Sequence, residues 1–597
     1  MFHKLLIANR GEIAVRVIRA CEELGVGTVA VYSELDRDAV HVRRADEAFL
    51  LGPGPAAESY LSVERLLQAV ERSGAEAVHP GYGFLAENAA FATALARHGI
   101  VFVGPSAEAI EAMGSKTRAR ELMAAAGVPI VPGTTAPVES VEDARRVIAE
   151  RIGFPVAVKA AGGGGGKGFR VALDEGELEA AFEGASREGE KFFSDPAVYL
   201  ERYLPDPRHV EVQVLADGHG HVIHLGERDC SVQRRHQKLI EEAPAPAVSA
   251  ELRERIGRIA VDAAAAVGYS GAGTVEGLLA GGEYFFLEMN TRVQVEHCVT
   301  EMVTGVDIVK EGIRVAAGEP LSYSQDEIVL RGHAIECRIN AEDASRNFAP
   351  APGRIGAYRE PAGPGVRVDS GVGPGSEVSP MYDPMVAKLV VWDADREQAT
   401  ARMLRALGEF EIGGLRTLLP FHKALLASEQ WAAAETCRDL VEDRGWLKAL
   451  AFPPAEKPGE AVEEKLEQEY TVEVSGKRFD VRVIGPPSAN GAAAGRGLAG
   501  PGRAGPSPRR AARPASGAGG HNGETLVSPL QGTVLKVSVQ RGAVVEEGAL
   551  ICVIEAMKME NEITAHRSGT VTELPVAVGA SVATGDTLAV ITSPPQG

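Results

Sequence analysis

Four short segments of the chain alternate polar and apolar side chains at a spacing of two residues, the repeat of a β-strand. Their polar positions are His209, Glu211 and Gln213; Glu288 and Asn290; Arg292, Gln294 and Glu296; and Glu336, Arg338 and Asn340. One such polar stripe would be expected on the solvent-exposed face of an antiparallel sheet, but four of them favour a shared site. Carboxylate and amide oxygens suit Mg²⁺ that bridges ATP phosphates, and phosphoryl transfer also needs positioned cations and a base. The stripes therefore predict a phosphoryl-transfer site.

A glycine-rich loop at residues 162–168 follows a strand-like segment that ends at Lys159. A lone loop of this kind is more often a flexible linker, and it lacks the Gly-Lys-Ser/Thr ending of a P-loop. Its place between that segment and the apolar run at 169–173 fits a mobile flap whose backbone N–H groups cradle phosphates. We therefore expect the loop to cover a nucleotide.

An internal repeat lies near the C-terminus, where residues 532–556 align without gaps on residues 569–593 with their glycines in register. Two similar β-rich halves predict a small barrel or flattened sandwich with approximate twofold symmetry. Between the halves, Lys558 stands between Met557 and Met559, which predicts an exposed hairpin tip. Most lysines on a protein surface are simply solvated. Two methionines beside this one, however, would expose apolar surface at the tip, which indicates that a partner recognises the segment.

The elements that position these residues follow from the hydrophobic pattern. A strand, a turn with Gly11, a helix to Leu24 and a second strand open the chain, and similar alternation continues to about Trp446. This order predicts an α/β architecture with a mostly parallel sheet. Residues 456–469 are acidic and helical in character, and residues 470–484 alternate like a hairpin. Residues 486–522 are rich in Gly, Ala, Pro, Ser and Arg, which predicts a flexible tether with an r.m.s. span of roughly 30–35 Å.

Composition narrows the class of protein. The 597 residues carry 62 Lys and Arg against 82 Asp and Glu, a formal net charge of −20, which disfavours nucleic acid and anionic membrane as partners. Six cysteines without a Cys-x-x-Cys pair argue against a disulfide framework or a structural zinc site. No secretory signal or spanning apolar stretch is present, so we expect a cytoplasmic protein.

Several motifs are similar to those of known families. The first 447 residues or so resemble biotin carboxylase of the ATP-grasp superfamily, through segments 4–14, 79–88, 162–168 and 288–297. The segment around Lys558 and its flanking repeats resemble a biotin carboxyl carrier domain; the related lipoyl domains usually lack the second methionine. The whole chain resembles the α subunit of an acyl-coenzyme A carboxylase. The resemblance implies an α/β ATP-grasp fold followed by a small all-β biotinyl/lipoyl-like flattened barrel.

The resemblance also implies six parts of the chain. They are an N-terminal α/β domain (1–114), an ATP-grasp domain (115–325), a C-terminal carboxylase domain (326–447), a short helix and hairpin region that resembles a reduced subunit-docking remnant (448–485), the linker (486–522) and the biotinyl carrier domain (523–597).

Ligand contacts are implied residue by residue. The nucleotide would contact Lys116, Lys159, Gly163, Gly164, Gly165, Gly166, Lys167, Gly168, Glu201, Arg202, Tyr203, Leu204, His209, Gln233, His236, Glu276 and Leu278. Two Mg²⁺ or Mn²⁺ ions would be held by Glu276, Glu288 and Asn290. Covalent biotin would be carried on Lys558.

The resemblance further implies a mechanism. Lys238 and Arg292 would hold bicarbonate, with Gln294 and the backbone of Val295 beside it. Glu296 would deprotonate bicarbonate for attack on the γ-phosphate, which gives carboxyphosphate and then CO₂ and phosphate. That phosphate would remove the biotin ureido proton, and Arg338 would stabilise the enolate oxygen. Tyr82 would lie near the biotin ring.

Partners are implied as well. Residues beyond the carboxylase region hold no second large α/β unit, so we expect carboxyl transfer to a malonyl- or methylmalonyl-CoA type of product on a separate carboxyltransferase β subunit. Biotin protein ligase would attach the biotin, and the assembly would be a hetero-oligomer with several α subunits. Three alternatives stay open: a subunit of a two-subunit pyruvate carboxylase, a non-catalytic biotin carrier scaffold, and a lipoyl carrier. The acyl substrate is selected by the partner.

Three positions depart from the family pattern. Cys298 stands where proline is usual, which we expect to loosen a strand exit near Glu296. Gly312 replaces a polar residue on the following helix, at a cost of about 1 kcal/mol relative to Ala. Lys167 replaces a frequent arginine in the glycine loop and loses its bidentate fork. None of these removes a reacting group, so we expect an active enzyme.

Overall fold

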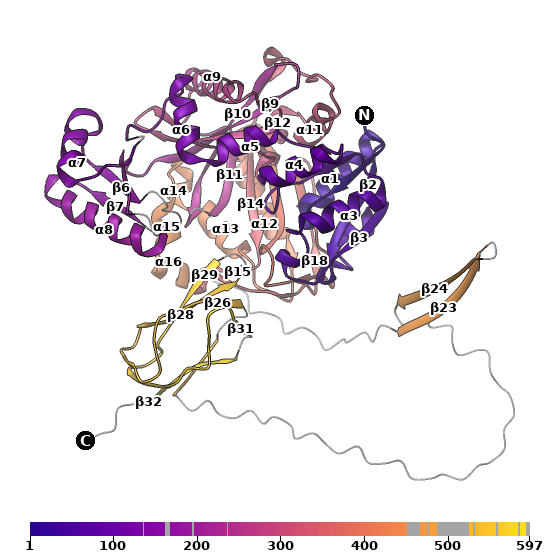
Figure 1. Ribbon diagram of the computed structural model, residues 1–597. Coiled ribbons are helices and arrows are strands. Elements are labelled where there is room, and N and C mark those ends of the chain that lie inside the picture. Colours follow the sequence, from indigo (N-terminus) through magenta and orange to yellow (C-terminus); the bar gives the residue numbers. More distant parts are fainter. Residues whose placement is uncertain are drawn as a thin grey trace, which may run out of the picture.

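The computed structural model describes residues 1–134, 136–160, 168–193, 196–235, 237–450, 466–474, 477–485, 524–528, 532–556, 559–582 and 585–592. Figure 1 shows the large body formed by the first 450 residues, the small β-domain near the C-terminus in yellow, and an isolated hairpin in orange.

The N-terminal part is a parallel sheet with the strand order β3-β2-β1-β4-β5. Its strands are β1 (Lys4–Ile7), β2 (Gly27–Ser33), β3 (Glu47–Gly52), β4 (Ala77–His79) and β5 (Val101–Phe102), with α1 (Gly11–Leu24), α2 (Val40–Arg44), α3 (Val63–Ser73) and α4 (Ala89–Arg97). The central strand β1 is almost entirely buried, as expected for a parallel strand covered on both faces. The predicted opening order of strand, helix and strand is confirmed, and Gly25 ends α1 in the left-handed conformation with φ of 70°.

A second, eight-stranded sheet has the order β13-β12-β9-β10-β11-β14-β21-β19. The strands are β9 (Arg208–Ala216), β10 (Val222–Arg234), β11 (Gln237–Ala243), β12 (Gly271–Ala280), β13 (Glu283–Asn290), β14 (His333–Asn340), β19 (Val366–Ser370) and β21 (Met385–Asp393). All of its pairings are antiparallel, so the prediction of a mostly parallel sheet is wrong for this part of the chain. The polar stripes were the better guide, because antiparallel strands can keep one polar face whereas covered parallel strands read as continuous apolar runs.

Helices cover this sheet and a separate three-stranded sheet lies beside it, on the left of Figure 1. The covering helices are α5 (Ala107–Gly114), α6 (Lys116–Ala125), α9 (Ala250–Ala266), α10 (His297–Thr304), α11 (Ile308–Ala316), α12 (Arg396–Glu409) and α13 (Leu419–Leu426). The smaller sheet has the order β7-β6-β8 and consists of β6 (Val156–Ala160), β7 (Phe169–Ala172) and β8 (Val198–Arg202), with α7 (Val141–Val147) and α8 (Glu175–Phe193) packed on it. Residues 161–167 of the glycine loop lie outside the described residues.

Short elements complete the large body. They are β15 (Glu342–Asp343), β16 (Ala349–Pro350), β17 (Gly353–Arg354), β18 (Tyr358–Arg359), β20 (Glu377–Val378), β22 (Glu411–Ile412), α14 (Glu429–Ala432), α15 (Arg438–Glu442) and α16 (Arg444–Ala449).

The third polar stripe is not a strand. Strand β13 ends at Asn290, and residues 291–296 form an irregular connection whose last residue, Glu296, directly precedes α10. Alternation of polar and apolar residues over only six positions does not distinguish a strand from an irregular connection whose polar side chains face a site.

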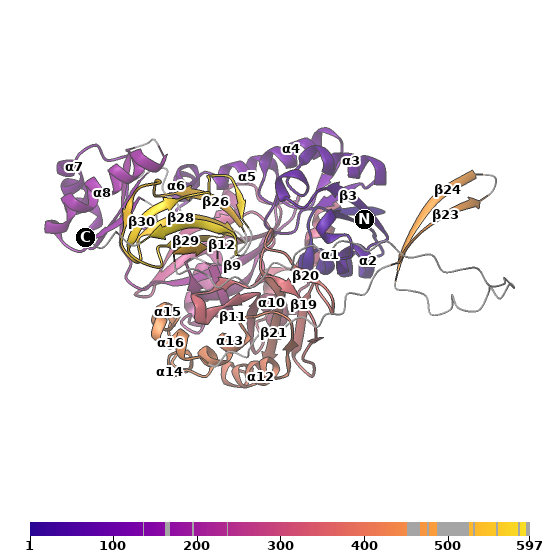
Figure 2. The same cartoon turned by 90° about the horizontal axis from the view of Figure 1, so that it is seen from below.

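The C-terminal domain consists of two four-stranded sheets that the internal repeat relates to each other, as Figure 2 shows in yellow. One sheet has the order β25-β32-β30-β27 and the other β29-β28-β26-β31. The strands are β25 (Thr525–Val527), β26 (Gly532–Val537), β27 (Val544–Val545), β28 (Leu550–Ala556), β29 (Met559–Thr564), β30 (Gly569–Glu573), β31 (Ser581–Val582) and β32 (Thr587–Thr592). The predicted all-β fold is confirmed.

Two equivalent glycines explain part of this symmetry. A Cβ on Gly532 would stand 2.2 Å from the carbonyl oxygen of Glu555, and one on Gly569 would stand 2.3 Å from that of Thr592. Both halves therefore require glycine where two strands approach closely. Met557 and Lys558 lie outside the described residues, so the hairpin-tip position of Lys558 stays a prediction; the flanking Ala556 and Met559 are paired.

A hairpin joins β23 (Leu466–Val474) to β24 (Lys477–Gly485), as predicted for residues 470–484. The helical character predicted for residues 456–469 is wrong for 466–469, which belong to β23. Residues 451–465 and the predicted tether at 486–522 lie outside the described residues. Among the helices that the structure describes, none is both long and apolar enough to cross a membrane.

Candidate active site

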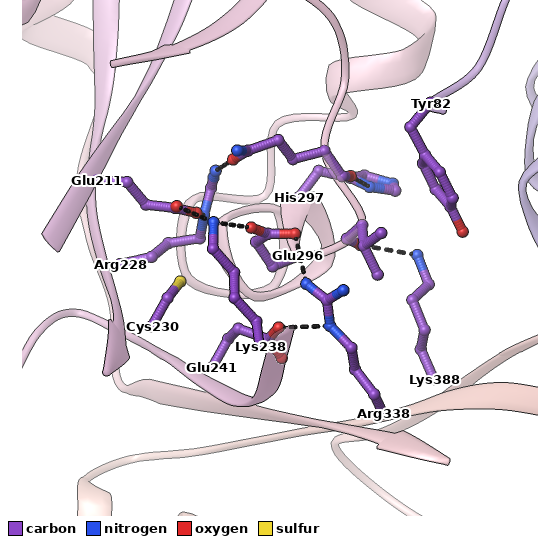
Figure 3. Close-up of polar contacts among 12 residues, drawn as sticks. Tyr82, Glu211, Arg228, Cys230, Lys238, Glu241, Glu296, His297, Arg338 and Lys388 are labelled. Atoms are coloured by element: carbon purple, nitrogen blue, oxygen red, sulfur yellow. Dashed lines mark hydrogen bonds and ion pairs between the residues drawn. The ribbon is translucent and has the colours of Figure 1, made fainter. Parts of the chain in front are cut away.

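Arg228 is one member of the polar network that Figure 3 shows. It lies on β10, is fully buried, and donates to five side chains that come from β9, β12, the connection into α10 and α10 itself. The acceptors are Glu211 (2.7 Å), Gln213 (2.7 Å), Thr300 (3.0 Å), Thr274 (3.2 Å) and Gln294 (2.8 Å). Since a buried guanidinium needs partners for all its donors, this arrangement fixes the position of Gln294 and Glu211.

Lys238, on β11, joins three carboxylates. Its Nζ donates to Glu211, to Glu296 at 2.6 Å and to Glu276 at 3.0 Å. Burial by itself would lower the pKa of Lys238, but Glu211 and Glu296 outweigh burial and raise the pKa well above its usual value. Lys238 is therefore a permanent cation among the polar stripes.

Glu296 has the properties of an ionised base. Its side chain is 3% exposed, and its two oxygens accept from Lys238 and from Nη2 of Arg338 at 2.9 Å. Burial alone would raise the pKa of Glu296, but Lys238 and Arg338 outweigh it and lower the pKa below the usual value. The carboxylate is thus charged at neutral pH and lies between two cations.

Arg338 joins the site to the sheet behind it. On β14, its Nε donates to Glu241 at 2.6 Å while Nη2 binds Glu296. The Cα partner of Arg338 on β21 is Lys388, whose Nζ donates to the carbonyl oxygen of Val295 at 2.9 Å. Tyr82 donates to Glu12, which lies 3.3 Å from Lys388. These contacts place Arg338 beside the connection that carries Val295 and Glu296 (Figure 3).

Three predicted metal ligands lie on two neighbouring strands. Glu276 on β12 is the direct Cα partner of Glu288 on β13. Nδ2 of Asn290 donates to Glu276 at 2.8 Å, and Oδ1 of Asn290 accepts from Arg292 at 2.7 Å. Lys238 and His209 outweigh the burial of Glu276 and lower the pKa of its carboxyl. Two opposed carboxylates destabilise a strand pair unless a cation offsets them, so these residues fit a hard divalent ion.

The predicted nucleotide residues fall into two groups. On the small sheet, Lys159 forms an ion pair with Glu201, which also accepts from Arg120 at 2.8 Å. Arg202 ends β8, followed by Tyr203 and Leu204.

On the large sheet, His209 lies 2.9 Å from Glu276 and is the Cα partner of the half-buried Leu278, while Gln233 donates to a backbone carbonyl of its own strand. Burial would lower the pKa of His209, but Glu211 and Glu276 raise it to about 9.

Some predicted contacts lie outside the described residues. These are Gly163, Gly164, Gly165, Gly166, Lys167 and His236, together with the side chain of Lys116. The backbone N–H of Gly168, the last residue of the loop, donates to Glu188 at 2.8 Å.

Several residues of the network were not among the predicted site residues, including Arg228, Glu241, Lys388 and Glu87. The last binds Nε of Arg292 at 2.8 Å. The sequence holds one signal for Glu241, since adjacent Glu241 and Glu242 continue an apolar strand and a buried carboxylate needs a partner. Arg228 and Lys388 carry no comparable signal, because only the folded sheet buries them.

Cys298 does not stand at a strand exit, so the expected loosening there is wrong. It lies in the first turn of α10, is fully buried, and its Sγ is 3.2 Å from Asp369 and 3.1 Å from Lys388. The thiol fills a polar pocket behind Val295 that a proline ring would leave without a hydrogen-bonding group.

Comparison with known proteins agrees with this fold. Four family models match: "Biotin carboxylase, N-terminal domain" at residues 1–110, "Carbamoyl-phosphate synthase L chain, ATP binding domain" at 115–324, "Biotin carboxylase C-terminal domain" at 336–443 and "Biotin-requiring enzyme" at 524–591. The fold is that of an ATP-grasp carboxylase followed by a carrier domain.

Individual relatives extend the match. The acyl-coenzyme A carboxylase alpha3 subunit of Mycobacterium leprae, described as biotin-dependent, is 46% identical over 98% of both chains. A pyruvate carboxylase subunit of Methanothermobacter thermautotrophicus is 54% identical over 74% of this chain and 90% of its own. The biotin carboxylase domain of Hydrogenobacter thermophilus 2-oxoglutarate carboxylase, solved with MgADP and bicarbonate, is 49% identical with a TM-score of 0.68, over 74% of this chain and 99% of its own.

The chain therefore belongs to the biotin carboxylase family and carries a biotin carrier domain in addition. Its activity is that of a ligase: it carboxylates biotin with bicarbonate in an ATP-dependent reaction.

Proposed function

We propose that this chain is the α subunit of an acyl-coenzyme A carboxylase. It would carboxylate biotin held on Lys558 and pass the carboxyl group to a separate carboxyltransferase β subunit, after a biotin protein ligase has loaded it. The observation that carries the proposal is the match to the mycobacterial alpha3 subunit, which covers the carboxylase and the carrier domain alike, 98% of both chains. The domain boundaries given under Sequence analysis belong to this proposal.

The geometry supports the residue roles in this proposal. Glu296, kept ionised by Lys238 and Arg338, would take the proton of bicarbonate so that it can attack the γ-phosphate of ATP. Lys238 and Arg292 would hold the anion beside Gln294 and Val295. Arg338 is a cation next to the base, and it would stabilise negative charge that develops on the ureido oxygen. Tyr82 would face the ring. Biotin, when bound, supplies the nitrogen that accepts the carboxyl group.

Mg²⁺ or Mn²⁺ would be held by Glu276, Glu288 and Asn290, where it would neutralise phosphate charge. The opposed positions of Glu276 on β12 and Glu288 on β13 support this assignment. Lys159, Glu201 and Leu278 would contact the nucleotide, along with the other predicted nucleotide residues.

The role of Glu296 can be tested by its isosteric variant. Glu296→Gln keeps the shape of the side chain and removes the base, so we expect bicarbonate-dependent ATP hydrolysis with free biotin to fall at least 100-fold. Equilibrium binding of ATP should stay within about threefold of wild type. A variant that hydrolyses ATP at near the wild-type rate would exclude Glu296 as the base.

A second candidate is the carboxylase subunit of a two-subunit pyruvate carboxylase, because the pyruvate carboxylase subunit of Methanothermobacter thermautotrophicus is 54% identical. One experiment distinguishes the two candidate functions. The biotinylated chain is captured from its native cells together with its partner, and bicarbonate fixation is measured with a panel of acyl-coenzyme A esters and with pyruvate. We expect fixation on an acyl ester only, and none with Lys558→Arg. Fixation on pyruvate alone would favour the second candidate.

A further inference from the structure

Two buried carboxyl groups lie side by side behind Arg338. Glu241 on β11 and Glu336 on β14 are direct Cα partners in the antiparallel pairing, and both are fully buried. Side chains opposed in this way leave the same face of the sheet with Cβ atoms about 4.5–5.5 Å apart. Figure 3 shows Glu241 joined to Nε of Arg338.

Most oxygens of this pair have no hydrogen-bond partner. One oxygen of Glu241 accepts from Arg338 at 2.6 Å, but its Oε2 is buried without a partner among the described residues. Both oxygens of Glu336 are also buried and have no hydrogen-bond partner among the described residues. Two charged carboxylates this close together repel each other, whereas one shared proton converts the repulsion into a hydrogen bond.

The surroundings favour a proton on Glu336. The charged and titratable groups that face it are Glu241, Arg338, Lys388, and Glu296 and Cys298 at the start of α10. Burial and the charge of Glu241 raise the pKa of Glu336 well above its usual value, against the influence of Lys388. Burial and Glu296 raise the pKa of Glu241 only to about 7, because Arg338 stabilises its charge.

We propose that Glu336 stays protonated during turnover and donates to Oε2 of Glu241, which keeps its own charge for Nε of Arg338. Glu336 is then a positioning residue: it acts through Glu241 on the orientation of the guanidinium that faces Glu296. The inference rests on the role proposed above for Arg338, but the protonation itself is measurable without that role.

Infrared difference spectroscopy of the full-length protein at pH 8 tests the proton. At this pH Glu241 is above its pKa, so we expect a C=O stretch of a protonated carboxyl group that shifts in D₂O and is lost in Glu336→Gln. The matched control is Glu342→Gln on β15, a buried carboxyl whose pKa burial and Asp383 raise to about 7; it should remove no band at pH 8. Wild-type and Glu336→Gln spectra that coincide would overturn the proposal.

Kinetics with free biotin test the positioning role. Glu336→Gln keeps an N–H donor for Glu241, so we expect kcat within about twofold of wild type. Glu336→Leu removes the donor, and we expect kcat/KM for biotin to fall at least tenfold while the KM for ATP changes little. Equal losses in both variants, or no loss in the Leu variant, would overturn the role. If the Leu variant does not fold, the infrared result decides. An active Arg338→Ala variant would instead contradict the function proposed for Arg338. The infrared band would still report whether Glu336 is protonated.

Discussion

Arg228 shows how one side chain can organise a site without facing the ligands. Its five acceptors include Glu211, which also holds Lys238, and Gln294, which precedes Glu296 by two residues. Because the guanidinium is planar and presents its donors in a rigid fork, it sets the relative positions of three strands and a connection. Lys238 and Arg338 are thus held by carboxylates, and one of these carboxylates, Glu211, is held by a buried arginine.

We predict that Arg228→Met lowers the free energy of unfolding by about 3–5 kcal/mol, because Glu211 would keep a buried charge without its main partner. Arg228→Lys keeps the charge but loses the fork, so stability should fall less and kcat should still fall. Denaturant titration measures the first effect. The exposed Arg255→Met, which gives up only a contact to a backbone carbonyl, serves as control and should stay within about 0.5 kcal/mol. A loss below 1 kcal/mol for Arg228→Met would show that the network repacks.

Helix α11 carries one residue that its environment does not require. Asp307 caps its start by accepting from the N–H of Lys310 at 2.9 Å, and Ile308, Val309 and Ile313 are buried on its inner face. Gly312 is also buried, but a Cβ there would meet no atom within 4 Å. Glycine in this helix therefore costs backbone entropy without enabling a close approach.

We predict that Gly312→Ala raises the free energy of unfolding by about 0.5–1 kcal/mol. Gly305→Ala, at the end of α10, is the matched control: its Cβ would also meet no atom within 4 Å, but φ is +77°, so the variant should destabilise. Thermal unfolding of both variants checks the prediction. A lower thermal midpoint for Gly312→Ala would mean that packing around the small cavity lined by Gly312 requires glycine at this position.

At the scale of the molecule, four of the buried histidines that the structure describes couple stability to pH. Burial lowers the pKa of His41 and His422 to about 4 and that of His79 and His297 to about 3. An unfolded histidine has a pKa near 6.5, so unfolding takes up a proton at each site between these values. The stability they contribute is complete above pH 6.5 and is lost as the pH falls toward 4.

We predict that the thermal midpoint of the full chain falls between pH 7 and pH 5, with about 1.4 kcal/mol lost per pH unit for each histidine below pH 6.5. His41→Gln keeps a donor for the carbonyl oxygen of Val31 and removes the titration, so it should flatten the dependence by about one proton. An unchanged slope in this variant would assign the acid sensitivity to other groups.

Several features of this protein could be predicted from the sequence alone, because they depend on local patterns of residues. The stripe residues, the repeat, the opening strand and helix, and the family resemblance all depend on residues close together in the chain. Alternation at a spacing of two did reveal polar faces, and for His209, Glu288 and Arg338 the strands are where the pattern predicts them.

Only the tertiary structure decided which strands are neighbours, and with them the charges of the site. Glu241 and Glu336 are 95 residues apart, and Arg228 meets Gln294 across 66 residues, so no local pattern relates them. Their pKa values and hydrogen bonds arise from burial and proximity, which exist only once the antiparallel sheet has formed. A lysine or glutamate in an unfolded chain is a solvated charge, whereas the folded sheet places it in a buried ion pair or shifts its pKa.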